Sequence, residues 1–162
     1  MSYSIRRAKL EDMKQIQQVA RISWHDTYEG IIPVLIQDQF LNTAYSDEMM
    51  KRRIEHSLLL VTEMERKIVG FANFSPIKEN GEAELGAIYL LPNAQGAGIG
   101  TALLHEGIQK LSGVKKIFIN VEKDNHVGKR FYEAKGFEVV SEIDDDFDGH
   151  KLKTIRMALR VS

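Results

Sequence analysis

The chain has 162 residues, the size of one domain, and 43% of them are hydrophobic, which is enough for a sizeable core and argues against disorder. Lys and Arg (22) nearly balance Asp and Glu (23), so the formal net charge of -1 argues against a nucleic-acid binder that relies on phosphate neutralisation. Cysteine is absent, which excludes disulfides, thiolate-bound metals and a cysteine nucleophile.

No apolar segment typical of a signal peptide follows residues 1–7, and no apolar run approaches the roughly 18 residues of a membrane span. We therefore expect a cytoplasmic protein without a membrane partner. The five histidines lack the close spacing of metal ligands, so no metal site is expected.

In the first half of the chain, helix and strand signals are mixed. Met13, Ile16 and Val19 recur at the spacing of one helical face, and Ser46 followed by two acidic residues is typical of a helix start. The elements expected here are a strand at 3–7, helices at 11–23, 33–40 and from 46 onward, and strands at 58–62 and 67–74.

The second half is more regular. Gly136 is typical of the left-handed residue that ends a helix, and Asp144–Asp148 is expected to form an acidic loop between the last two strands. The expected elements are strands at 84–91, 116–121, 137–143 and 154–161 and helices at 99–111 and 127–135. With no internal repeat or linker, this order predicts a single domain over residues 1–162, of the α/β (α+β) class, around one sheet.

The most informative segment is the glycine-rich stretch from Leu90 to Thr101. A strand ends there, Gly96, Gly98 and Gly100 alternate with other residues, and a helix begins. Glycine lets a ligand approach the backbone closely, and the first turn of a helix offers unpaired N–H groups, so the segment predicts a site for a phosphate or diphosphate. A flexible connection that binds nothing is the alternative.

Two common phosphate-binding motifs are absent. A P-loop needs a lysine after its last glycine, but Thr101 follows Gly100. A dinucleotide-binding fingerprint needs a third glycine where Thr101 or Leu103 stands. The pattern that does fit is Q/R-x-x-G-x-G/A, which Gln95–Gly100 satisfies.

This pattern and a second one downstream resemble motifs of the GNAT superfamily of N-acetyltransferases. Gln95–Gly100 is similar to the acyl-CoA-binding loop of that family, and Asn125–Phe137 is similar to its N-x-x-A-x-x-F-Y-x-x-x-G-F block. The order of elements agrees over about residues 2–161, and the motifs are specific over 84–137. The resemblance implies the GNAT-like acyl-CoA N-acyltransferase fold, a single mixed and mostly antiparallel central sheet flanked by helices, with acetyl-CoA as co-substrate.

The resemblance also implies which residues bind the coenzyme. N–H groups of the glycine-rich segment would contact the diphosphate, and the preceding strand would lie beside the pantetheine arm and donate an N–H to the thioester carbonyl. Ala97 stands where many relatives carry a basic residue, so backbone groups are expected to dominate, and Gly128 in place of the usual alanine leaves room for a ligand chain. The implied coenzyme-binding residues are Ile88, Tyr89, Leu90, Gln95, Gly96, Ala97, Gly98, Ile99, Gly100, Thr101, Asn125, Lys129 and Tyr132.

Two residues are candidates for the catalytic proton transfers. Tyr132 falls on the family's catalytic tyrosine, and a phenol with an intrinsic pKa of about 10 is suited to protonating a leaving thiolate; the alternative is a half-buried helix residue. Glu84 is the candidate base, because counting by two along its strand places it on one face with Ile88 and Leu90; the alternative is a solvated charge. Asn125 is expected to position the coenzyme arm or a water, or else to cap the following helix.

The amine acceptor is expected to bind between the N-terminal helices and the loop before the last strand. Trp24 and Tyr28 lie one helical turn apart in an aromatic and polar segment and are the candidate substrate-binding residues, although Trp24 also suits the core. His25 is an alternative base. Asp144–Asp148 would attract a cationic amine if it rims the cleft, and is otherwise a solvated surface.

These observations predict an N-acetyltransferase that moves an acetyl group from acetyl-CoA to a primary amine of a small molecule, polyamine or peptide by direct attack. A non-catalytic acyl-CoA-binding sensor on the same fold and a nucleotide-binding protein of another class are the alternatives. The expected partners are acetyl-CoA and the amine, without nucleic acid or membrane, and the sequence leaves a homodimer open.

Overall fold

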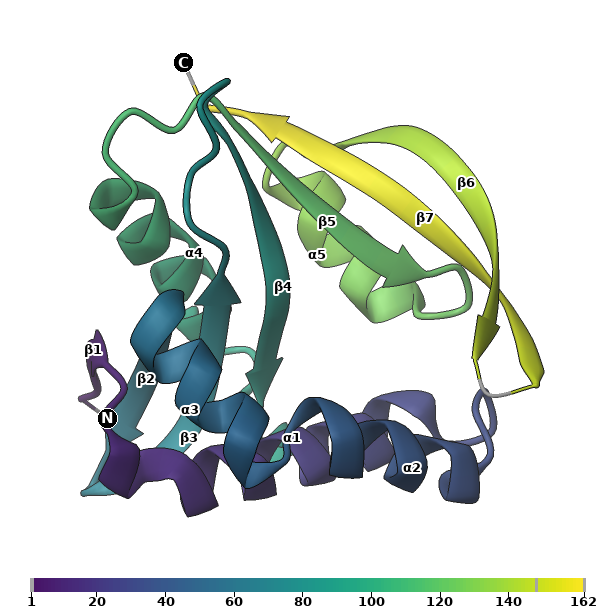
Figure 1. The fold of residues 1–162 in the computed structure, drawn as a ribbon, viewed down its shortest axis with the longest axis horizontal. Coiled ribbons are helices and arrows are strands. Elements are labelled where there is room, and N and C mark those ends of the chain that lie inside the picture. The colour runs from purple at the N-terminus through teal and green to yellow at the C-terminus, as the bar shows by residue number, and fades with distance from the viewer. Residues whose placement is uncertain (1, 148, 162) are drawn as a thin grey trace.

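The helices and strands follow the predicted order in the computed structural model, which describes residues 2–147 and 149–161 (Figure 1). Each predicted helix and strand is present, with its ends displaced by a few residues. None of the described helices has the length and apolar character of a membrane-spanning segment. The elements are β1 (Ser4–Arg7), η1 (Leu10–Asp12), α1 (Met13–Tyr28), α2 (Val34–Ala44), α3 (Asp47–His56), β2 (Leu58–Met64), β3 (Lys67–Phe74), β4 (Glu82–Leu90), η2 (Pro92–Ala94), α4 (Ile99–Lys110), β5 (Lys116–Glu122), α5 (His126–Ala134), β6 (Glu138–Phe147) and β7 (His150–Arg160).

The strands form one seven-stranded sheet in the order β1-β2-β3-β4-β5-β7-β6. Every neighbouring pair is antiparallel except β4 and β5, which are parallel. The prediction of a mixed, mostly antiparallel central sheet flanked by helices is confirmed.

Each face of the sheet carries its own apolar core, because each face is covered by a different set of helices (Figure 1). On one face, α4 contributes Ile99, Leu103 and Leu104, and α5 lies farther along the same face. On the other face, α1, α2 and α3 contribute buried residues such as Ile16 and Met50. Both cores meet β4, which therefore lies at the centre of the molecule.

Strands β4 and β5 separate soon after they meet, as the V between them in Figure 1 shows. They pair only at three positions, where Glu82–Glu84 lies beside Lys116–Phe118. Beyond this point β4 pairs only with β3, and β5 pairs only with β7. The edges of β4 and β5 that face each other are therefore left without strand partners over the second half of β4.

A β-bulge at Gly86 reverses the faces of β4. Phe74 of β3 lies opposite Leu85, whereas Asn73 lies opposite Ala87, so Gly86 is an extra residue in β4. Leu85, Ile88 and Leu90 consequently join the core on the α4 side, and Ala87 and Tyr89 join the core on the α1 side. The prediction that Glu84 shares a face with Ile88 and Leu90 is wrong, because counting by two does not allow for the bulge.

The acidic run is a strand and not the predicted loop. Residues Asp144–Phe147 belong to β6, and Asp148 lies outside the described residues. Lysines on β7 lie opposite the acidic residues, with Asp144 beside Lys153 and Asp146 beside Lys151, so opposite charges offset the low strand propensity of aspartate. Phe147 then packs on α1 and α2, because its ring lies 4.9 Å from Phe40 and 6.0 Å from Trp24, measured between ring centroids.

Candidate functional site

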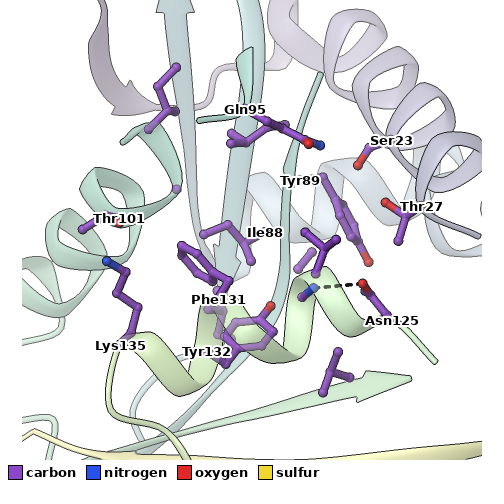
Figure 2. Close-up of a pocket in the computed structure, with 18 of the residues that line it drawn as sticks. Ser23, Thr27, Ile88, Tyr89, Gln95, Thr101, Asn125, Phe131, Tyr132 and Lys135 are labelled. Carbon is purple, nitrogen blue, oxygen red and sulfur yellow. Dashed lines mark hydrogen bonds between the residues drawn. The ribbon is translucent and has the colours of Figure 1, made fainter. Parts of the chain in front are cut away.

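A cavity of about 580 Å³ occupies the gap between β4 and β5 (Figure 2). Its walls come from α1, from β4 and the glycine-rich segment, from the start of α4, and from β5 and α5. Because these elements belong to distant parts of the chain, the cavity depends on the separation of the two strands. It is the place where a long, flexible ligand can lie across the sheet.

One end of the cavity is formed by a helix start that no side chain caps. Gly96 and Gly98 adopt the left-handed backbone conformation, with φ of 82° and 81°, and Gly98 is the N-cap residue directly before α4. No side chain caps this helix start, so the N–H groups of its first turn are open to the cavity that Gly98, Ile99 and Gly100 line. Uncapped N–H groups at a helix N-terminus bind phosphate well, as the sequence predicts.

Lys135, which the sequence analysis missed, adds a positive charge at this end. Its side chain lies beside Thr101 in Figure 2, and its Nζ is 5.7 Å from the centroid of the Phe131 ring. Among the described residues that line the cavity, Lys135 is the only lysine or arginine. Lys135 directly follows the C-terminal end of α5, so only the tertiary fold reveals that its charge lies near the glycine-rich segment.

The edge of β4 offers backbone groups to the gap. The N–H of Leu91 donates to the carbonyl oxygen of Val69 at 2.8 Å, which turns Leu91 toward β3. Because backbone groups alternate along a strand, the N–H and C=O groups of Ile88 and Leu90 point the opposite way, toward the cavity. An extended chain that contains amides can pair with this edge.

Tyr132 lies in the middle of the cavity wall (Figure 2). Its ring packs edge-on against Phe131 and Phe137, with 5.4 Å between ring centroids in each case. Burial raises the pKa of the Tyr132 phenol, and the nearby phenols of Tyr89 and Tyr28 raise it further. The hydroxyl therefore keeps its proton at neutral pH and is available as a donor.

Asn125 caps α5 and also lines the cavity. Its Oδ1 accepts a hydrogen bond from the N–H of Gly128 at 2.9 Å (Figure 2). A Cβ atom at Gly128 would lie 2.7 Å from Nδ2 of Asn125. The absence of a side chain at Gly128 thus makes room for the capping side chain of Asn125.

Glu84 does not line the cavity. Its Oε1 accepts a hydrogen bond from Nη1 of Arg156 at 3.1 Å, its Oε2 accepts one from Nη2, and these bonds raise the pKa of Arg156. The same Nη1 donates to Oδ1 of Asn120 at 3.0 Å, and Asn120 does line the cavity. Glu84 is therefore connected to the cavity through two side chains.

Some of the other predicted residues line the cavity and others do not. Tyr28 lines the cavity, but Trp24 lies in the core, stacked on Phe40 at 4.5 Å between ring centroids, and His25 pairs with Asp38 at 2.9 Å. Ala97 and Lys129 are also absent from the cavity wall. The predicted residues that line it are Tyr28, Ile88, Tyr89, Leu90, Gln95, Gly96, Gly98, Ile99, Gly100, Thr101, Asn125 and Tyr132.

Several cavity-lining residues were not predicted. Ser23 already stood out as part of the inward face of a helix, and the helical period would have led from it to Asp26 and Thr27. No group of three or more His, Asp or Glu side chains suited to a metal ion is found in residues 2–147 and 149–161. The unpredicted lining residues with polar or large side chains are Ser23, Asp26, Thr27, Leu85, Asn120, Val121, Val127, Phe131 and Lys135.

Comparisons with known proteins agree on one family. A model described as the acetyltransferase (GNAT) family matches residues 16–137. An uncharacterized N-acetyltransferase of Bacillus subtilis is 34% identical over 94% of this chain and 90% of its own, and a spermidine N(1)-acetyltransferase of Thermoplasma acidophilum is 32% identical over 91% and 95%. The crystal structure of the PaiA N-acetyltransferase from Thermoplasma acidophilum in complex with coenzyme A superposes with a TM-score of 0.84, at 30% identity, over 99% of this chain and 100% of that one.

Proposed function

Because this chain belongs to the acetyltransferase (GNAT) family, we propose that it transfers the acetyl group of acetyl-CoA to a primary amine by direct attack. Family membership makes it an acetyl-CoA-dependent N-acyltransferase; the acceptor and the roles of individual residues are our proposal. One observation carries it: a single cavity joins an uncapped helix start, a free strand edge and a protonated phenol.

In this proposal, acetyl-CoA lies along the gap between β4 and β5. Its diphosphate contacts the N–H groups from Gly98 to Thr101 and the ammonium group of Lys135. Its pantetheine amides pair with the backbone of Ile88 and Leu90, which brings the thioester to the wall that contains Tyr132.

The reaction then needs an attack and two proton transfers. The amine nitrogen bonds to the thioester carbon, and the negative charge on the carbonyl oxygen is stabilised by an N–H of β4. The C–S bond breaks, and the Tyr132 hydroxyl gives its proton to the sulfur. The nitrogen loses its extra proton to Glu84 through water, and Tyr132 is reprotonated from solvent.

The family relatives support a polyamine among the primary amines that the sequence predicts. The Thermoplasma relative is named for the acetylation of spermidine, and the match to it spans 91% of this chain. Peptide amines and other small amines belong in the same test.

The proposal is tested by the release of free coenzyme A thiol from acetyl-CoA with a panel of polyamines, small amines and peptides. We expect thiol release in equal amount to N-acetylated product, identified by mass spectrometry, with at least one amine. Tight binding of acetyl-CoA with no product from any amine would favour the sensor, and tight binding of NAD or ATP without binding of acetyl-CoA would contradict the proposal.

The role of Glu84 as proton acceptor gives a second expected result. Glu84→Gln should lower kcat/KM by about 10²-fold, the low end of the range for general bases, because Glu84 is paired with Arg156 and reaches the cavity only through water. The loss should be largest at low pH, where the amine is most fully protonated. Glu82→Gln, on the same strand and without an ion pair in the described structure, is the matched control. An unchanged pH profile in Glu84→Gln would remove Glu84 as the base.

A further inference from the structure

We propose that the cavity-facing side of α1 is a subsite for aliphatic di- and polyamines, in which Ser23 and Thr27 receive the reacting nitrogen and Asp26 binds a second ammonium group. This inference rests on the proposed function and names its acceptor class. It assigns the acceptor to residues within three positions of Trp24, which itself lies in the core.

The three side chains share one face of α1. Asp26 and Thr27 follow Ser23 by three and four positions, the spacing that brings side chains together on a helix. All three line the cavity, and the hydroxyls of Ser23 and Thr27 point across it toward Tyr89 of β4 (Figure 2). An acceptor between α1 and β4 would thus approach the strand edge along which the thioester is proposed to lie.

None of the three side chains makes a hydrogen bond or ion pair with another described residue. Ser23 is only 3% exposed, so its hydroxyl has little contact with bulk solvent and faces the cavity instead. Side chains that line the cavity without a protein partner keep their donors and acceptors available to a ligand. Two neighbouring side chains on α1 do have protein partners, since Arg21 and His25 both pair with Asp38.

Charge divides the cavity into two ends. Asp26 is the only acidic residue among the described residues that line it, and Lys135 is the only lysine or arginine. Lys135 lies at the end proposed for the diphosphate, so the opposite sign of Asp26 marks the end for a cation.

The depth of the three residues separates two binding roles. Ser23 is buried, whereas Asp26 is exposed at the rim. Hydroxyl oxygens accept N–H bonds from a neutral amine and leave its lone pair free to attack, while a carboxylate favours an ammonium group that stays protonated. Side chains one turn apart are separated by about 5–6 Å between Cβ atoms, which is similar to the span of three or four methylene groups. A diamine of that length fits both positions.

The test compares 1,4-diaminobutane and spermidine with butylamine, which has the same carbon chain as the diamine but no second charge. We expect the wild-type protein to have a KM about tenfold lower for the diamine than for butylamine, the effect of one charge-assisted hydrogen bond. Asp26→Asn should abolish this difference by raising the KM for the diamine to that for butylamine. Glu29→Gln, an exposed acid at the end of the same helix that does not line the cavity, is the matched control and should keep the difference.

The two hydroxyls have a different signature. Ser23→Ala and Thr27→Val should lower kcat/KM for butylamine and the diamine by the same factor, because the hydroxyls that they remove contact the nitrogen that both substrates share.

A preference for the diamine that survives in Asp26→Asn would overturn the subsite.

Calorimetry separates this inference from the proposed function. If the wild type acetylates none of the amines, the proposed function fails, and binding of 1,4-diaminobutane and butylamine to the protein saturated with coenzyme A decides the subsite. Tighter binding of the diamine that is lost in Asp26→Asn would support it, and equal binding of the two amines to the wild type would overturn it.

Discussion

Tyr132→Phe is expected to lower kcat by about 10²–10⁴-fold, the range for loss of a general acid, with little change in the KM for acetyl-CoA. The variant keeps the ring that packs on Phe131 and Phe137 and loses only the hydroxyl, so the cavity wall stays intact. Without a donor, the sulfur must leave as a thiolate. Steady-state kinetics with saturating amine, together with calorimetric binding of acetyl-CoA, measure the two effects separately.

The pKa of Tyr132 sets the pH range of this effect. Because burial raises that pKa above the ordinary value of about 10, the phenol is protonated throughout the neutral and mildly alkaline range, and the defect of Tyr132→Phe should be constant there. Tyr45→Phe is the matched control, since burial also raises the pKa of Tyr45 but its side chain lies away from the cavity. Wild-type turnover in Tyr132→Phe would remove Tyr132 as the acid.

Gly98→Val is expected to weaken the binding of acetyl-CoA by about 100-fold or more, equivalent to about 2.7 kcal/mol. Gly98 has a φ of 81°, which a β-branched residue adopts only with strain, and a Cβ atom at this position meets no protein atom within 4 Å. The added side chain would therefore project into the open space where the helix start is proposed to receive the diphosphate. Calorimetric titration with acetyl-CoA measures the loss.

Gly113→Val separates the blocked site from the backbone strain. Gly113 has nearly the same φ, 85°, and the same open surroundings, but it lies between α4 and β5 and does not line the cavity. Both variants should lose similar stability in thermal unfolding, by about 1–3 kcal/mol, whereas only Gly98→Val should lose affinity. Equal affinities in the two variants would contradict the assignment of the glycine-rich segment to the diphosphate.

The sequence predicted those features of the molecule that depend on residues close together in the chain. The alternating glycines before Ile99 predict a helix start open to an anion, and apolar periodicity predicts the helices that cover the sheet. The Asn125 block and the glycine-rich segment, together, also led to the right family.

The features that the sequence did not predict depend on contacts between distant residues. The bulge at Gly86 is visible only against Asn73 and Phe74 of β3, and it decides which way Glu84 faces. Lys135 reaches the glycine-rich segment only because α5 packs beside it. The acidic run extends as a strand because β7 places lysines opposite it.

Because β4 and β5 separate, the sheet consists of two parts, here called plates, and the short stretch of pairing between β4 and β5 is the seam that joins them. One plate consists of β1–β4 and the other of β5, β7 and β6, and only three residue pairs connect them directly. A coenzyme whose amides occupy the open part of the seam completes it from the inside, as a further strand would. Binding of acetyl-CoA to the folded state would then raise the free energy of unfolding. Depletion of acetyl-CoA would therefore lower the stability of the protein as well as stop the reaction.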